Sequence, residues 1–127
     1  MHKRILIVDD NLLNRKLATA MLSRSGWETA DAENGTQALK MLEGNHGFLA
    51  VLLDISMPGI NGDEVCRLLR ADENTAGLPV VAYTAHAMDE DRERILAAGF
   101  DAIVIKPTSL ETLLGCLQQA LDARGVV

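Results

Sequence analysis

Aromatic side chains are scarce in this sequence of 127 residues, which holds one Trp, one Tyr and two Phe. Its core must therefore be built from aliphatic side chains. Cysteine is also rare, since Cys66 and Cys116 lie in separate helix-like segments with no Cys or His partner at metal-ligand spacing. We interpret both as packing residues, which argues against a zinc site and against a disulfide framework.

Long apolar runs and an excess of basic residues are absent as well. No apolar segment approaches the roughly 20 residues of a membrane-spanning helix, and the basic start reaches Asp9 after only four apolar residues, too few for a signal peptide. With 12 Lys and Arg against 18 Asp and Glu, the net charge is −6, which does not favour nucleic-acid binding. We expect a cytoplasmic protein without membrane or nucleic-acid partners, folded as a single domain over residues 1–127.

Short apolar runs alternate with segments of helical period along the whole chain. Predicted strands lie near 4–8, 27–31, 48–53, 78–84 and 101–105. Predicted helices lie between 13 and 26, near 35–43, from 62 onward, near 87–98, and from 109 onward. The first helix is indicated by the spacing of Leu13, Leu17, Ala20 and Met21. This alternation predicts an α/β fold, a doubly wound (βα)5 parallel sheet covered by helices on both faces.

Side chains suited to metal or phosphate chemistry follow four of the five predicted strands. They are Asp9 and Asp10 after the first, Asp54 after the third, Thr84 after the fourth and Lys106 after the fifth. The carboxyl ends of parallel strands share one edge of the sheet, and ligands bind there where the winding reverses, so these groups are expected to converge. Three carboxylates in one crevice either raise a pKa or require a cation, and a divalent ion is the less costly solution; their oxygens favour Mg²⁺, with Mn²⁺ as a plausible substitute.

An aspartate in such a site can act as the nucleophile of a phosphoryl transfer. A phosphoryl group on Asp54 would bring roughly two negative charges. Lys106, the metal and the Thr84 hydroxyl would then share the phosphoryl oxygens, which is how positioning and charge neutralisation accelerate this reaction. We therefore take Asp54, Thr84 and Lys106 as catalytic candidates, and Asp9, Asp10 and Asp54 as candidate metal ligands.

The motifs around these residues are similar to those of two-component receiver domains, and the similarity covers nearly the whole chain. It rests on the acidic pair at 9–10, the VLLDISMPGING segment at 51–62, Thr84, and Lys106 followed by a proline. The resemblance implies the flavodoxin-like receiver fold with strand order 2-1-3-4-5. It also implies that the peptide bond between Lys106 and Pro107 is cis.

The resemblance also assigns roles to single residues. Asp54 would be the phospho-acceptor, and Asp10 the more direct metal ligand of the acidic pair. Ser56 would offer its backbone carbonyl to the metal, and Thr84 would be the switch hydroxyl. Ser56 and His86 would flank the path of the attacking water, so both are predicted to set the lifetime of the aspartyl phosphate.

A receiver domain is expected to be a signalling switch rather than an enzyme with a substrate of its own. It would take its phosphoryl group from a histidine kinase or a histidine phosphotransfer protein and then change its binding to a downstream protein. The expected output face comprises the fourth helix, the fifth strand and the fifth helix, with Met88, Arg92, Ile103 and Ile105 as candidate contacts. Alternation along the strand predicts that only one isoleucine faces outward, and family position favours Ile103. Receivers often carry Tyr or Phe there, and Tyr83 is no replacement because it should lie on the strand face opposite Thr84.

Two other interpretations remain open. A Mg²⁺-dependent phosphohydrolase also uses an aspartyl nucleophile, but it needs a general-acid aspartate where Ser56 stands, and a chain of this length has no cap domain. The second alternative is that the chain is a receiver domain cut from a hybrid histidine kinase. Its start just before the first strand and its end just after the last helix favour a stand-alone regulator, similar to the DivK kind.

Overall fold

Five parallel strands form one sheet in the order β2-β1-β3-β4-β5, so the expected topology is confirmed. The computed structural model describes residues 3–85 and 89–125. The strands are β1 (Arg4–Val8), β2 (Glu28–Ala32), β3 (Ala50–Asp54), β4 (Val80–Thr84) and β5 (Ala102–Ile105). The helices are α1 (Leu12–Arg24), α2 (Gly35–Met41), α3 (Gly62–Ala71), α4 (Asp89–Ala97) and α5 (Leu110–Ala123). The winding reverses at β1, which lies between β2 and β3, and this places the switch point at the carboxyl ends of β1 and β3.

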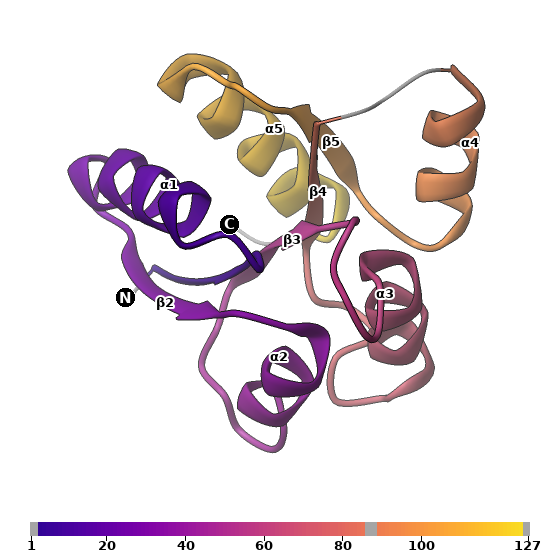
Figure 1. Cartoon of the computed structure of the whole chain (residues 1–127). Coiled ribbons are helices and arrows are strands. Elements are labelled where there is room, and N and C mark those ends of the chain that lie inside the picture. The colour runs from indigo at the N-terminus through magenta and orange to yellow at the C-terminus, as the bar shows by residue number, and fades with distance from the viewer. Residues whose placement is uncertain (1–2, 86–88, 126–127) are drawn as a thin grey trace.

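Helices cover both faces of the sheet (Figure 1), with α1 and α5 on one face and α2, α3 and α4 on the other. Alternate residues of β1, β3, β4 and β5 enter opposite cores, as the two-residue period of a strand requires. On β1, Ile5 and Ile7 pack under α1 and α5, whereas Leu6 and Val8 pack under α2 and α3. Both cores are predominantly aliphatic, and Trp27 is buried in the first of them, beside β2.

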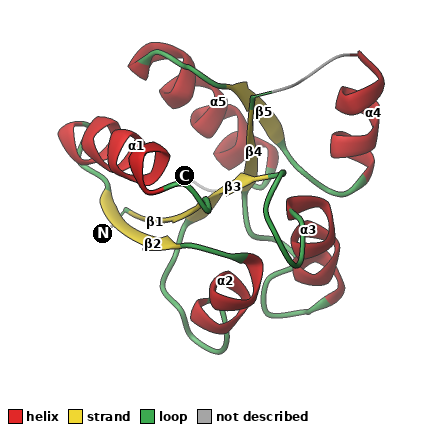
Figure 2. Ribbon diagram, viewed as in Figure 1, coloured by secondary structure: helices red, strands yellow, loops and turns green. Residues whose placement is uncertain are grey.

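Polar residues in the loops that follow the strands cap several helices. Each side chain accepts a hydrogen bond from the backbone N–H three residues further on, at the N-caps Asn11, Asn34, Asn61 and Ser109. Such a cap satisfies one of the amides that the first turn of a helix leaves without a partner. The connections from β1 to α1 and from β2 to α2 are short (Figure 2), whereas residues 55–61 form a longer loop between β3 and α3.

The element positions agree closely with the sequence-based predictions, but the surface of α1 does not follow from its apolar spacing. Leu13 and Leu17, whose spacing indicated this helix, are 64% and 50% exposed. The buried residues of α1 are instead Arg15, Ala18 and Leu22. Ala18 and Leu22 pack in the core under α1 and α5, and Arg15 can be buried beside them because its guanidinium has hydrogen-bond partners there.

The remaining global expectations have clear outcomes. Cys66 and Cys116 are both free, with Cys66 buried in the core. The peptide bond Lys106-Pro107 is cis. Within residues 3–85 and 89–125, none of the helices has the length and apolar character needed to cross a membrane.

Candidate functional site

The carboxylates predicted to meet at the switch point do so. Asp9 directly follows β1, and Asp54 is the last residue of β3. Ligand oxygens of Asp9, Asp10 and Asp54 all lie within 4.8 Å of one another. The three side chains line a hollow of about 330 Å³, to which Ser56 and Lys106 also contribute.

Lys106 reaches this hollow from the end of β5 and is the cation closest to the acids among the described residues. Its Nζ donates to Asp9 Oδ2 at 2.7 Å and lies 3.5 Å from Asp54 Oδ1. The same ammonium stands 4.7 Å from the ring centroid of Tyr83. Because the aromatic face attracts a cation, the Tyr83 ring helps to hold Lys106 beside the carboxylates.

Asp54 is an unusual carboxyl group because it is buried, with 5% of its surface exposed. The pKa of Asp54 is raised from 3.8 to about 6, mainly by burial and also by the neighbouring charge of Asp9, while Lys106 and the backbone amide of Ser56 lower it in part. A cation placed beside this carboxyl group would favour its ionised form. The site is therefore suited to holding a metal ion.

The first turn of α3 packs directly on the backbone of Asp54. The N–H of Gly62 donates to the Ile55 carbonyl at 2.9 Å. A Cβ at Gly62 would clash with the carbonyl oxygen of Asp54 and lie only 2.7 Å from Cα of Ile55. Only glycine permits this approach, so the NG step of the sequence motif has a structural reason.

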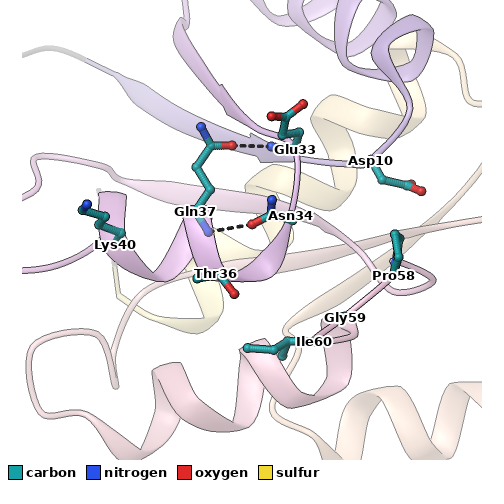
Figure 3. A pocket seen from close by; sticks show the side chains of 9 residues that line it. All are labelled: Asp10, Glu33, Asn34, Thr36, Gln37, Lys40, Pro58, Gly59 and Ile60. Carbon is teal, nitrogen blue, oxygen red and sulfur yellow. Dashed lines mark hydrogen bonds between the residues drawn. The ribbon is translucent and has the colours of Figure 1, made fainter.

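Asp10 differs from its neighbours because it is exposed. It stands between the acidic hollow and a second, larger groove of about 910 Å³. Figure 3 shows this groove between the start of α2, with Asn34 and Gln37, and the loop that carries Pro58 and Ile60. Because Asp10 is exposed, its carboxylate is accessible to a cation from solvent.

Thr84 lies at the neighbouring strand end but is set back from the hollow. Its side chain is buried, and the next residue, Ala85, is the one that lines the hollow. The Thr84 carbonyl accepts from the Lys106 N–H at 2.8 Å, which ties the ends of β4 and β5 together. Tyr83 belongs to the core under α1 and α5, whereas Ala82 belongs to the opposite core, so the expected placement of Tyr83 on the other face is confirmed.

The expectation for the two isoleucines of β5 was wrong. Residues two apart on a strand share a face, so Ile103 and Ile105 both point to the side of α4. Ile103 is partly buried against the core on this side, while Ile105 at the end of the strand is 41% exposed. Ile105 is therefore the more accessible of the two. Arg92 is exposed on α4, and His86 and Met88 lie outside the described residues.

Two residues with direct links to the site were missed by the sequence analysis. Arg15 donates to the backbone carbonyl of Asp9 at 2.7 Å, and Tyr83 packs under Lys106. A polar residue within a helical pattern gives no signal that separates Arg15 from a surface arginine. Tyr83 was correctly placed on its strand, but the position of the lysine above it depends on β5.

Comparison with known proteins decides the family. Residues 5–118 match the response regulator receiver domain. The chain belongs to this family. As a receiver domain of a two-component system, it is a signalling domain and not an enzyme in the usual sense, and receivers bind Mg²⁺ at an acidic pocket such as the one formed by Asp9, Asp10 and Asp54.

Individual receiver proteins match over nearly their full length. The polar-differentiation response regulator DivK of Brucella ovis is 38% identical over 121 residues, which cover 95% of this chain and 98% of DivK. The structure of the chemotaxis protein CheY4 of Vibrio cholerae is 28% identical with a TM-score of 0.86, covering 95% of this chain and 100% of CheY4. The receiver domain of the sensor histidine kinase PA1611 from Pseudomonas aeruginosa is 33% identical with a TM-score of 0.87, covering 96% and 99%. That receiver was solved with a magnesium ion coordinated in its active site cleft.

Proposed function

We propose that this chain is a cytoplasmic switch that accepts a phosphoryl group on Asp54 from the phospho-histidine of a histidine kinase or of a histidine phosphotransfer protein. The observation that carries the proposal is the position of Asp54, a buried carboxylate opening into a hollow next to Lys106 and the acidic pair. Bond formation between a carboxylate oxygen and phosphorus gives an acyl phosphate, and the histidine nitrogen leaves with the electron pair of the broken bond.

The acidic residues fit a divalent ion with oxygen ligands. Asp9, Asp10 and Asp54 would hold Mg²⁺, or Mn²⁺ in its place, together with the backbone carbonyl of Ser56. Asp10 would be the more direct ligand, since one oxygen of Asp9 is already paired with Lys106. Before phosphorylation, the three carboxylates, Lys106 and one Mg²⁺ would sum to a net charge of zero, and the ion would neutralise part of the charge on the incoming phosphoryl oxygens.

Lys106 and Thr84 would report the new phosphate to the rest of the domain. Lys106 would exchange its bond with Asp9 for a phosphoryl oxygen, and Thr84 would turn its hydroxyl toward the same group. Thr84 ends β4 and Lys106 directly follows β5, so the movement would reach α4, β5 and α5 first. We propose that this face binds the downstream partner, with Ile105 and Arg92 as exposed contacts.

The phosphohydrolase alternative receives no support from the site. Ser56 stands two residues after Asp54, where such an enzyme would need a carboxyl group as general acid. A serine hydroxyl does not supply an acid of that strength. The DivK relatives and the PA1611 receiver belong to a regulator and to a kinase, and both fit the proposed phosphoryl acceptance.

The acceptor is tested by incubating the protein with acetyl phosphate and Mg²⁺ and measuring the intact mass. We expect one phosphoryl group on the wild type, none on Asp54→Asn, and none when a chelator removes the metal. Asp72→Asn, an exposed carboxylate at the end of α3, is the matched control and should be labelled normally. Labelling of Asp54→Asn at another residue would refute the assignment.

The output face is tested with beryllofluoride, a stable mimic of the aspartyl phosphate. Amide NMR spectra with and without the mimic should differ most on α4, β5 and α5, beyond the residues that line the hollow. The change should persist in Ile105→Ala, which removes only an exposed contact, and partner affinity should fall in that variant. Leu17→Ala on α1 is the control for loss of an exposed apolar side chain. Shifts concentrated on α1 and α2 would place the output elsewhere.

A further inference from the structure

Arg15 is a buried cation with two partners, one directly after β1 and one on β2. Its side chain is only 11% exposed, although the next residue of α1, Lys16, is exposed. Nη1 donates to the backbone carbonyl of Asp9 at 2.7 Å, and Nε donates to Asp31 Oδ2 at 2.8 Å. The carboxylate of Asp31, at 53% exposure, remains largely in water. Arg15 therefore ties the residue after β1 to the edge strand β2.

The bonds of Asp9 show what this tie controls. Its backbone N–H donates to the Ala32 carbonyl at 3.1 Å, and its Oδ1 accepts from the Asn11 N–H at 2.9 Å. Its Oδ2 accepts from Lys106 and its carbonyl accepts from Arg15. The Asp9 backbone is thus held on both sides by groups that do not involve Lys106.

We infer that Arg15 is a positioning residue that fixes the acidic pair when Lys106 moves. This inference rests on the proposed function, in which Lys106 leaves Asp9 for the phosphoryl oxygens. Without a separate anchor, the Asp9 carboxylate could follow the departing ammonium or turn away from the metal. The Arg15 bond keeps the Asp9 backbone in place, so its carboxylate stays within reach of the ion, and Asp10 stays with it.

An electrostatic role and a positioning role of Arg15 predict opposite effects of its substitution on Mg²⁺ affinity, which makes the inference testable. Arg15 is a positive charge close to an acidic site, so a purely electrostatic role predicts that its removal tightens Mg²⁺ binding. A positioning role predicts weaker binding, because residues that orient metal ligands typically change affinity by about 10-fold to 100-fold. The sign of the change therefore separates the two roles.

The experiment measures Mg²⁺ affinity by calorimetric titration of the wild type and of Arg15→Gln, Arg15→Lys and Asp31→Asn. Lys16→Gln is the matched control, because it removes the same charge from an exposed position on the same helix. We expect Arg15→Gln to bind Mg²⁺ about 10-fold more weakly, Arg15→Lys and Asp31→Asn to give intermediate affinities, and Lys16→Gln to match the wild type. An unchanged or higher affinity in Arg15→Gln would overturn the inference.

A second measurement does not depend on metal or on phosphorylation. Hydrogen exchange of the Asn11 amide, which bonds to Asp9 Oδ1, should speed up in Arg15→Gln and Arg15→Lys but not in Lys16→Gln. If Asp54 proves not to be phosphorylated, this exchange rate still decides whether Arg15 positions Asp9. If Arg15→Gln fails to fold, Arg15→Lys and Asp31→Asn carry the comparison, and wild-type exchange in both would overturn the inference.

Discussion

Burial and charge act in opposite directions on Asp54. The carboxyl group must be ionised to attack phosphorus, yet burial raises its pKa to about 6 and favours the protonated form. Lys106 supplies one compensating charge at 3.5 Å, and a metal ion supplies the rest. In the absence of metal, the residue that is most important for the proposed function therefore destabilises the folded domain.

The destabilisation of the folded domain by the Asp54 carboxylate depends on pH. The folded-state pKa of about 6 lies above the unfolded value of 3.8, so the folded protein binds the proton more tightly, and its stability falls as pH rises from about 4 to 6. In metal-free buffer near pH 8, Asp54→Asn should raise the free energy of unfolding by about 1–3 kcal/mol. The gain should vanish below about pH 4, where both states of the wild type are protonated.

Urea unfolding in the presence of a chelator, at several pH values, measures this difference. Asp122→Asn, an exposed carboxylate on α5, is the control and should show no comparable gain. If Asp54→Asn and the wild type have the same stability from acid to alkaline pH, the ionised carboxylate of Asp54 does not destabilise the fold.

At the scale of elements, the site depends on how closely α3 approaches the end of β3. Gly62 begins α3 with its Cα against the backbone of Asp54 and Ile55. The helix can approach no closer, and any side chain would push it away. The direction of the Asp54 side chain is therefore fixed by the packing of a helix as well as by its own strand.

Gly62→Ala should displace the first turn of α3 from Asp54. We expect a loss of about 1–3 kcal/mol in stability and slower phosphorylation by acetyl phosphate, because the acceptor oxygen is misplaced. Gly115→Ala on α5 is the matched control, since no heavy atom lies within 4 Å of its added methyl group. Helix propensity alone should make that variant more stable by about 0.5–1 kcal/mol. Equal stability of the two variants would show that the close contact at Gly62 does not affect the free energy of unfolding.

At the scale of the whole molecule, charge is unevenly spread. The chain has a net charge of −6, and three carboxylates meet at one edge of the sheet. Other acidic side chains are paired with arginines, as in Arg70 with Asp101 at 2.9 Å and Arg94 with Asp63 at 2.6 Å. Within the part of the chain that the structure describes, these three acids form the group whose oxygens lie close enough together to share a divalent cation.

Mg²⁺ should therefore raise the thermal unfolding midpoint of the domain. At a concentration of about 100 times Kd, linkage gives about 2.7 kcal/mol of stabilisation. Sodium chloride at matched ionic strength controls for general screening of the negative surface and should have a smaller effect. Asp10→Asn should lose most of the Mg²⁺-specific shift. A midpoint that responds equally to both salts would contradict a metal site at this edge.

The sequence by itself determined the order of elements and the residues at the strand ends. These features follow from local rules: the period of the apolar residues, the N-caps, and the rule that parallel strands end at one edge of the sheet. Asp9, Asp54 and Lys106 could be placed together because each directly follows an apolar run. The distances among them agree with that placement, while their chemical roles stay a proposal.

Only the tertiary structure decided what surrounds these residues. The buried side of α1 could not be read from its leucines, since Arg15 turns inward to partners supplied by β1 and β2. The position of Lys106 over Tyr83 depends on the pairing of β4 with β5, and the contact of Gly62 depends on the packing of α3. The physical reason is the same in each case: a side chain's environment is set by groups distant in sequence, which a local pattern does not contain.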